Sequence, residues 1–274
     1  MGARLGISPF ILTVALSGLE LENLAVGIAA NAKGIPGAAA GTVFGGVTFL
    51  ALGVAGLAAL ITPIEVTLPR AFVLWTAAAP LPTVALGLDG TISRVDGALL
   101  VAWFAVALVG VARSGRDVLA AEPPGRRRLA WARLVGGLAA LTLGGDLLGD
   151  SLRRVVTGLG VSPTVLGNTA IAAGVEAEEV GRVAVPARRG RPELALGNLA
   201  GTIVHFISLN AGVIALVRPL RLDHATLVLH MPVAAASTLV LCALLGLLGR
   251  LGRAHGIALV LLYALYVVAA IAAG

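Results

Sequence analysis

Nine apolar runs divide the chain, and nearly all of them are long enough to cross a membrane. The hydrocarbon core of a bilayer is about 30 Å thick and an α-helix rises about 1.5 Å per residue, so a crossing takes about 20 apolar residues. The runs fall at residues 7–30, 36–61, 71–88, 97–112, 129–148, 163–186, 194–217, 225–248 and 257–273. The sequence therefore predicts an all-α polytopic membrane protein with about nine transmembrane helices.

The composition excludes the main alternatives to a membrane protein. The chain is 58% hydrophobic and 12% charged, with a mean hydropathy of +0.98, so a lipid bilayer rather than water is its expected surroundings. A sequence pI near 10.9 would suit a nucleic-acid-binding protein. The basic residues, however, lie in short connectors with few aromatic side chains between them to stack on bases. We therefore expect no nucleic acid partner.

The distribution of Lys and Arg predicts the orientation in the membrane. The fourth connector is the most basic, with six arginines between Arg113 and Arg133, and cytoplasmic loops carry this excess. Alternating sides from that connector puts the N-terminus in the cytoplasm and the C-terminus outside. Lys33 is the single lysine among arginines, which suggests a GC-rich genome and a prokaryotic plasma membrane.

An internal repeat divides the chain into two related halves. At an offset of 156 residues, positions 18–64 align with 174–220 without a gap, and the match includes two pairs of glutamates. We expect a first half at 1–115, a cytoplasmic linker at 116–128 and a second half at 129–274. Five helices separate the starts of the two copies, and this odd number makes their topologies inverted. Inverted repeats are typical of secondary transporters, whose binding sites lie near the midplane where the repeats meet.

Carboxylates inside the apolar runs are the strongest candidates for a binding site. Each costs about 2.5 to 3.5 kcal/mol to insert, so they are expected to face a polar interior. In the segments GLELEN and GVEAEE, the first glutamate and the residue three positions later share a helical face. The four residues predicted to line one site in this way are Glu20, Asn23, Glu176 and Glu179.

Glu22 and Glu178 point away from that face if the helices are regular, although a break near Gly18 and Gly174 would swing them inward. Carboxylate and amide oxygens suit Ca²⁺, Na⁺ or proton exchange, and no thiolate or histidine cluster favours a softer metal. The alternative interpretation is a buried hydrogen-bonded network that binds no substrate.

The second helix of each repeat contains a GxxxG pattern, formed by Gly41 and Gly45 in one copy and by Gly197 and Gly201 in the other. Such patterns allow close helix packing, and their equivalent positions suggest that the helices cross beside the site. The neighbouring oxygen donors then become further candidate ligands, namely Thr42, Asn198 and Thr202.

The segments LGVSPTVLGNTAIAAGVEAEEV and ELALGNLAGTIVHF resemble the second alpha-repeat of the sodium/calcium exchanger family. The chain is expected to begin at the motif helix, so that either its start is truncated or this branch does without the family's usual opening helix. In that family, motif glutamates and helix oxygens coordinate Ca²⁺ and Na⁺. The resemblance implies this role for Glu179, Asn198 and Thr202 in the second repeat, and for Asn23 and Thr42 in the first. Asn23 stands where the family has a glutamate, and Gly46 where it has a serine. Glu20 and Glu176 are added acidic groups that could carry protons instead.

Arg182 stands three residues after Glu179 and four after Glu178, so it can pair with either carboxylate. Alternatively its guanidinium snorkels to the membrane surface. His205 is expected to be a packed, hydrogen-bonded histidine, whereas His230 is placed near a helix end and carries little information.

The sequence therefore predicts a secondary active cation antiporter that exchanges Ca²⁺ or a similar hard cation for Na⁺ or H⁺ by alternating access. The alternative is a degenerate, non-transporting scaffold or regulatory subunit whose site is locked by the Glu–Arg pair. An enzyme or ATP-driven pump is not expected, because Lys33 does not follow a GxxxxGK phosphate loop. We expect no cofactor and no nucleotide, only small inorganic cations as transported ligands.

Overall fold

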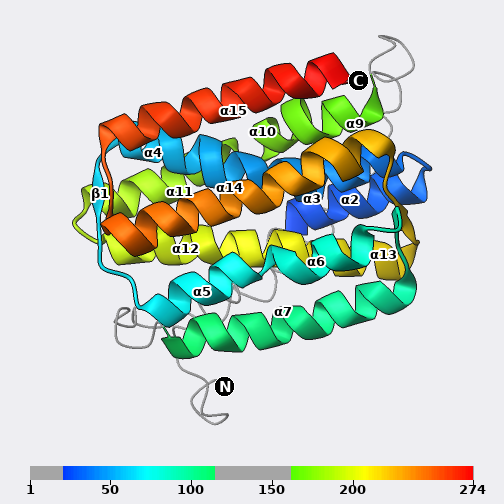
Figure 1. Ribbon diagram of the computed structural model, residues 1–274, viewed down its shortest axis with the longest axis horizontal. Coiled ribbons are helices and arrows are strands. Elements are labelled where there is room, and N and C mark those ends of the chain that lie inside the picture. The colour runs from blue at the N-terminus through cyan, green and yellow to red at the C-terminus, as the bar shows by residue number, and fades with distance from the viewer. Residues whose placement is uncertain (1–20, 115–161, 274) are drawn as a thin grey trace, which may run out of the picture.

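Long helices run roughly parallel to one another through the protein, as the computed structural model shows (Figure 1). The structure describes residues 21–114 and 162–273. Within these ranges, five helices are long and apolar enough to span a bilayer: Pro36–Ile61, Arg94–Val111, Pro192–Val217, Thr226–Leu248 and Arg253–Ala273. The prediction of an all-α polytopic membrane protein is confirmed. The run at 129–148 and the linker at 116–128 lie outside the described residues, so the count of nine helices and the boundaries of the halves stay predictions.

The first described range begins with helix α2 and ends with the long helix α7. A π-helical segment, η2, continues α3 into α4 without a break. The elements are α2 (Leu21–Ala32), α3 (Pro36–Thr48), η2 (Phe49–Val54), α4 (Ala55–Ile61), β1 (Ile64–Glu65), α5 (Arg70–Ala78), α6 (Pro80–Gly87), β2 (Thr91–Ile92) and α7 (Arg94–Ser114).

The second range has the same alternation of α-helical and π-helical segments. Its elements are α9 (Pro163–Leu166), η3 (Gly167–Ile171), α10 (Ala172–Val175), α11 (Ala177–Arg188), α12 (Pro192–Val204), η4 (His205–Asn210), α13 (Ala211–Val217), β3 (Leu220–Arg221), η5 (Thr226–His230), α14 (Met231–Ala243), η6 (Leu244–Leu248), β4 (Arg250–Leu251) and α15 (Arg253–Ala273).

The internal repeat is visible in the bounds of these elements. The helix α2, the run from α3 to α4, and the strand β1 recur as α11, the run from α12 to α13, and β3, all displaced by the same 156 residues. Figure 1 shows that the run from α3 to α4 and the run from α12 to α13 point in opposite directions. The two copies therefore have the inverted topology that the sequence predicted.

Matching glycine contacts join each repeat to a long helix at the edge of the bundle. A Cβ on Gly256 of α15 would lie 2.8 Å from the carbonyl oxygen of Gly56 in α4. A Cβ on Gly212 of α13 would likewise lie 2.8 Å from the carbonyl oxygen of Gly97 in α7. Only glycine permits backbones to approach this closely, as is common where membrane helices pack. The outer helices α7 and α15 are therefore fixed to equivalent places on the two repeats.

Two short antiparallel strand pairs tie the connectors together. β1 pairs with β4, and β2 pairs with β3. In Figure 1, β1 lies at one end of the bundle, near the last residues of α4 and the first residues of α15. Each pair links a connector of the first range to one of the second.

The helix boundaries differ from the predicted runs where proline or polar residues intervene. The predicted helix at 71–88 is divided into α5 and α6, because Pro80 begins a new segment after Ala79. The predicted helix at 163–186 is interrupted at Glu176 and extends to Arg188. The run at 36–61 has the bounds that its hydropathy predicted.

Candidate functional site

A break in the helix containing the GVEAEE segment creates the centre of the candidate site. Helix α10 ends at Val175 and α11 begins at Ala177, while Glu176 between them has φ −86° and ψ 2°, outside the helical range. The sequence suggested a break near Gly174, and the break lies two residues later. The break lies beside two glutamates, and transporters use broken membrane helices to bind ions.

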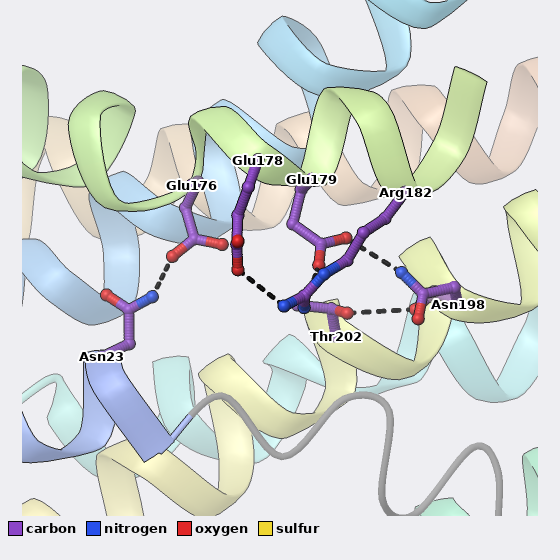
Figure 2. A network of polar contacts seen from close by, with 7 residues as sticks. All are labelled: Asn23, Glu176, Glu178, Glu179, Arg182, Asn198 and Thr202. Atoms are coloured by element: carbon purple, nitrogen blue, oxygen red, sulfur yellow. Dashed lines mark hydrogen bonds and ion pairs between the residues drawn. The ribbon is translucent and has the colours of Figure 1, made fainter. Parts of the chain in front are cut away.

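Glu176 joins the two repeats through a polar contact. Its side chain is completely buried, with 0% of its surface exposed. The side-chain amide of Asn23, on α2 of the first repeat, donates a hydrogen bond to Glu176 Oε1 (Figure 2). The predicted convergence of these two residues, 153 positions apart in the sequence, is present in the structure. Because the Asn23 amide is neutral, it orients the carboxylate without cancelling its charge.

Glu179 connects α11 to α12, and its side chain is also 0% exposed. The Asn198 side-chain amide donates a 2.9 Å hydrogen bond to Glu179 Oε2. The Thr202 hydroxyl, one turn further along α12, donates to the backbone carbonyl of Asn198 at 3.1 Å. Figure 2 shows these groups on facing helices on one side of the break and the contact between Asn23 and Glu176 on the other side.

Arg182 pairs with the glutamates rather than extending away from them. Its Nη1 lies 2.7 Å from Glu179 Oε1, and its Nη2 lies 2.6 Å from Glu178 Oε1. The Arg182 side chain is 42% exposed and that of Glu178 is 51% exposed, so only Glu179 brings a fully buried partner to the pair. Of the two interpretations open at the sequence level, the ion pair is the one that the structure contains.

The remaining candidates differ in their burial and surroundings. Thr42 is buried, and its hydroxyl donates to the carbonyl of Ala39 in its own helix at 2.9 Å. It faces Gly27 of α2, since a Cβ at Gly27 would lie 2.8 Å from Thr42 Oγ1. Glu22 is exposed on α2, next to the buried Asn23, and the break in the other repeat does not bury Glu178. Glu20 lies outside the described residues.

The GxxxG pattern of α3 packs against the helix that carries Glu176. A Cβ at Gly41 would lie 2.3 Å from the carbonyl carbon of Gly167, and one at Gly45 would lie 2.5 Å from the Cα of Asn168. The helices therefore cross here at close range, two turns before the break at Glu176, as the pattern predicted. Gly197 and Gly201 are buried at the equivalent positions of α12.

Donor chemistry favours a hard cation. Two carboxylates, two amides and a threonine hydroxyl supply oxygen atoms, which are the ligands that Ca²⁺ and Na⁺ prefer. Within residues 21–114 and 162–273, no three side chains of His, Cys, Asp or Glu converge as a preformed metal cluster. A cation held by these described side chains would therefore complete its coordination with amide, hydroxyl, backbone or water oxygens.

The histidines differ from one another in their surroundings. His205 is packed as predicted: its Nδ1 lies 2.8 Å from the carbonyl oxygen of Gly201, and its ring contacts Phe104 edge to face. His230 lies near the start of a helical run, as the sequence predicted, but its burial gives it a significance that its sequence context did not indicate. It lies inside the continuous helical run 226–248, at the junction of η5 and α14, and is completely buried. The signal that could have identified it is a titratable residue one turn inside an apolar run.

Comparisons with known proteins agree with this fold and this pattern. The family described as sodium/calcium exchanger protein matches residues 1–112 and 129–272. A protein of Alkalimonas amylolytica called "Putative antiporter CaxA" is 30% identical over 254 residues, which are 87% of this chain and 79% of that protein. The Escherichia coli (strain K12) inner membrane protein YrbG is 31% identical over 236 residues, 80% of this chain and 72% of YrbG.

Solved structures of the sodium-calcium exchanger NCX_Mj have the same fold. A structure soaked with zero Na⁺ and Ca²⁺ has a TM-score of 0.67 and 22% identity, covering 98% of this chain and 89% of that chain. A structure soaked with 2.5 mM Na⁺ and 1 mM Sr²⁺ has a TM-score of 0.68 and 24% identity, with 97% and 89% covered. With its inverted repeats, its buried glutamates and these matches over most of its length, the chain belongs to the sodium/calcium exchanger protein family.

Proposed function

We propose that the protein is a secondary antiporter that exchanges Ca²⁺, or a similarly hard cation, for Na⁺ or H⁺. The observation that carries the proposal is the pair of fully buried glutamates, Glu176 and Glu179, on either side of a helix break. Burying a carboxylate in the membrane interior costs several kcal/mol unless something balances its charge. In the structure Arg182 offers a positive charge to Glu179, and a bound cation would take over that role and balance Glu176 as well. The family and the antiporter name of the Alkalimonas relative support the same class of function.

The inverted repeats supply a means of alternating access. Asn23 comes from the first repeat and Glu176 from the second, so the contact between them lies at the interface of the two copies. A rocking motion of one repeat against the other would change access to this interface from one side to the other. Because the packing of α3 on η3 uses glycine, the two helices can keep this close contact while neighbouring segments move.

The number of charges in the site relates the pairing of Arg182 to the charge of the bound ion. Glu176 and Glu179 present two carboxylates, and Arg182 offers one positive charge to Glu179. Divalent binding is then best balanced when Arg182 leaves, whereas a single Na⁺ or proton can be accommodated on Glu176 while the ion pair persists. We therefore propose that the two transported ions occupy the site in turn and that Arg182 is paired with Glu179 only in one of the two states.

Flux into proteoliposomes tests this proposal. Uptake of ⁴⁵Ca²⁺ should respond to an outward gradient of Na⁺ or H⁺, and Glu176→Gln and Glu179→Gln should each abolish it, because a neutral amide cannot balance the cation. Glu65→Gln is the matched control, since Glu65 is exposed in a connector. Uptake that persists unchanged in both site variants contradicts the site assignment.

A second candidate function rests on the ion pair. If Arg182 holds Glu179 permanently, the site is locked and the protein is a non-transporting scaffold or regulatory subunit. The two functions differ in the unmodified protein. An antiporter binds Ca²⁺ or Na⁺ with Arg182 present, whereas a locked protein binds cations only after Arg182→Ala. Equilibrium binding of ⁴⁵Ca²⁺ to the wild type and to this variant separates them, with Arg188→Ala as the control for lost positive charge.

A further inference from the structure

A second group of buried polar side chains lies apart from the glutamates. It consists of Asn168 in η3, His230 at the end of η5, and Tyr263 and Tyr266 in α15. Asn168 and His230 are 0% exposed and Tyr266 is 4% exposed. The segments that carry them come from three different parts of the sequence. Such groups are costly inside a membrane and are a sign of function.

The hydroxyl of Tyr266 is the centre of this group. It lies 2.9 Å from His230 Nδ1, and it donates to the backbone carbonyl of Asn168 at 3.4 Å. The rings of His230 and Tyr266 stand edge to face with their centroids 5.7 Å apart, which fixes the orientation of the imidazole. Tyr266 therefore positions His230 and connects it to the helix that carries the glutamates.

Several atoms of the group have no hydrogen-bond partner among the described residues. These are His230 Nε2, Asn168 Oδ1 and the Tyr263 hydroxyl, each of them shielded from solvent. A buried polar atom left in this state costs about 1 to 3 kcal/mol. The group includes an acceptor that lacks a donor and a ring nitrogen that lacks a partner. A proton is the ligand that the unpartnered ring nitrogen of His230 would take up.

Asp223 lies seven residues before His230, just ahead of the same helical run. It precedes η5 by three residues and is exposed, and the Thr226 backbone N–H donates to its Oδ1 at 2.8 Å. Thr164 donates to its other oxygen. Of the elements packed on η5, α3 has no titratable residue and α14 has only Cys242, while His224 is exposed. Asp223 thus supplies a fixed negative charge about two helical turns from the imidazole, at the end of the bundle open to solvent.

The group also touches the helix crossing beside the glutamates. The backbone of Asn168, which accepts from Tyr266, is the surface against which Gly45 of α3 packs. Glu176 lies eight residues further along the same helical run. A change in charge at His230 would therefore act on the contact between α3 and η3 and, through it, on the site.

We propose that His230 is a proton-binding site inside the membrane-spanning region, oriented by Tyr266 and supported by the charge of Asp223, and that its protonation sets the pH dependence of cation exchange. The binding of the proton stands on the geometry alone, whereas its effect on exchange rests on the proposed function. Histidine is suited to this role because its charge changes in the range of about pH 5 to 8. The ligand is the proton itself, taken up at Nε2, because Nδ1 donates to the Tyr266 hydroxyl when that hydroxyl donates to Asn168.

Nitrogen-15 NMR of imidazole-labelled protein in lipid nanodiscs tests the binding step without any flux. His230→Gln identifies the signals of His230, and these should move from neutral imidazole to imidazolium as the pH falls from about 8 to about 5. In Asp223→Asn the transition should move to lower pH, because the supporting charge is gone. Tyr266→Phe keeps the histidine and should change the ratio of its two tautomers.

The coupling step is tested by ⁴⁵Ca²⁺ flux at a series of pH values. His230→Gln should lose most of the pH dependence that the wild type and the exposed control His224→Gln retain. A His230 signal that stays neutral over the whole range overturns the proton site. A His230 that titrates in an exchanger whose pH profile is unchanged by His230→Gln overturns the coupling. If no variant and no wild-type sample exchanges cations, the proposed function fails, and the titration alone decides the proton site.

Discussion

Replacing Arg182 with alanine should raise the affinity of the site for Ca²⁺ by about five- to tenfold. The guanidinium occupies Glu179 Oε1 at 2.7 Å, the same oxygen that a cation would use, so it competes for the carboxylate. A hydrogen bond to a charged group contributes about 1.5 to 3 kcal/mol, and a half-exposed ion pair about 0 to 1 kcal/mol. Because Arg182 is 42% exposed and Glu179 is fully buried, we place the pair between these cases. We therefore assign the Arg182–Glu179 pair about 1 kcal/mol or slightly more, and removing this competition corresponds to the five- to tenfold gain in Ca²⁺ affinity.

The same substitution should make the cation-free protein less stable. Without Arg182, the buried Glu179 keeps only the amide of Asn198 among the partners described above. We expect a loss of about 1 to 3 kcal/mol without Ca²⁺. At 100 times the dissociation constant, a ligand restores about 2.7 kcal/mol. The thermal midpoint of Arg182→Ala should therefore be lower than that of the wild type without Ca²⁺ and should rise more steeply with it.

The assay is equilibrium binding of ⁴⁵Ca²⁺ to purified protein, together with thermal unfolding over a range of Ca²⁺ concentrations. Arg182→Lys is an informative second variant, because lysine keeps the charge but cannot make the two-pronged contact with Glu178 and Glu179. It should fall between wild type and alanine. Arg188→Ala, at the exposed end of α11, controls for the change in net charge. Weaker or unchanged Ca²⁺ binding in Arg182→Ala refutes the competition.

Three further outcomes follow from the structure. Gly45→Ala should destabilise the protein by about 1 to 3 kcal/mol, because the new Cβ would lie 2.5 Å from the Cα of Asn168; Gly181→Ala, with open space around it, should be neutral or slightly stabilising in the same thermal assay. Asn23→Asp should strengthen divalent binding in ⁴⁵Ca²⁺ titrations, because it adds a carboxylate beside Glu176; weaker binding would show that the amide donor is required. Partial burial would raise the pKa of Asp223, but hydrogen bonds from Thr164 and Thr226 bring this pKa below its usual value. The ionised carboxylate therefore stabilises the fold at pH values above the unfolded pKa of about 3.9. This stabilisation is lost as the pH falls through the lower pKa of the folded state. Asp223→Asn should therefore lower the thermal midpoint at pH 7 and differ little from wild type well below pH 4, and an equal difference at both pH values would contradict this.

Hydropathy predicted the membrane spans well, because insertion into a bilayer depends mainly on the summed polarity of about 20 residues. The predicted run 36–61 has the same first and last residues as the helix in the structure. The bounds of helices, π-helical segments and strands in the two repeats differ by the same 156 residues as the sequence repeat. Hydropathy did not predict the division of the run 71–88 at Pro80, although a proline within a run is a local signal for one. These features depend on local sequence.

The details of the site depend on tertiary contacts that hydropathy does not contain. The sequence placed the break near Gly174, whereas the bond from Asn23 and the burial of Glu176 stabilise it two residues later. The ion pair of Arg182 and its snorkelling alternative differ by about 1 kcal/mol, so the sequence could not decide between them. His230 carried little weight in the sequence because its partner Tyr266 is 36 residues away, and Asn168, which accepts from Tyr266, is 62 residues from His230, so only folding brings the group together.

The central claim, that a hard cation binds beside Glu176 and Glu179, is tested most directly by anomalous diffraction from crystals soaked in Sr²⁺. Strontium is a heavier substitute for Ca²⁺ and is located by its own signal. The account predicts an anomalous peak within about 2.6 Å of carboxylate oxygens of these two residues, reduced or lost in Glu179→Gln. At saturating Sr²⁺, two results would contradict the account. One is an anomalous peak that appears only elsewhere in the protein, and the other is the absence of any peak while Arg182 still contacts Glu179.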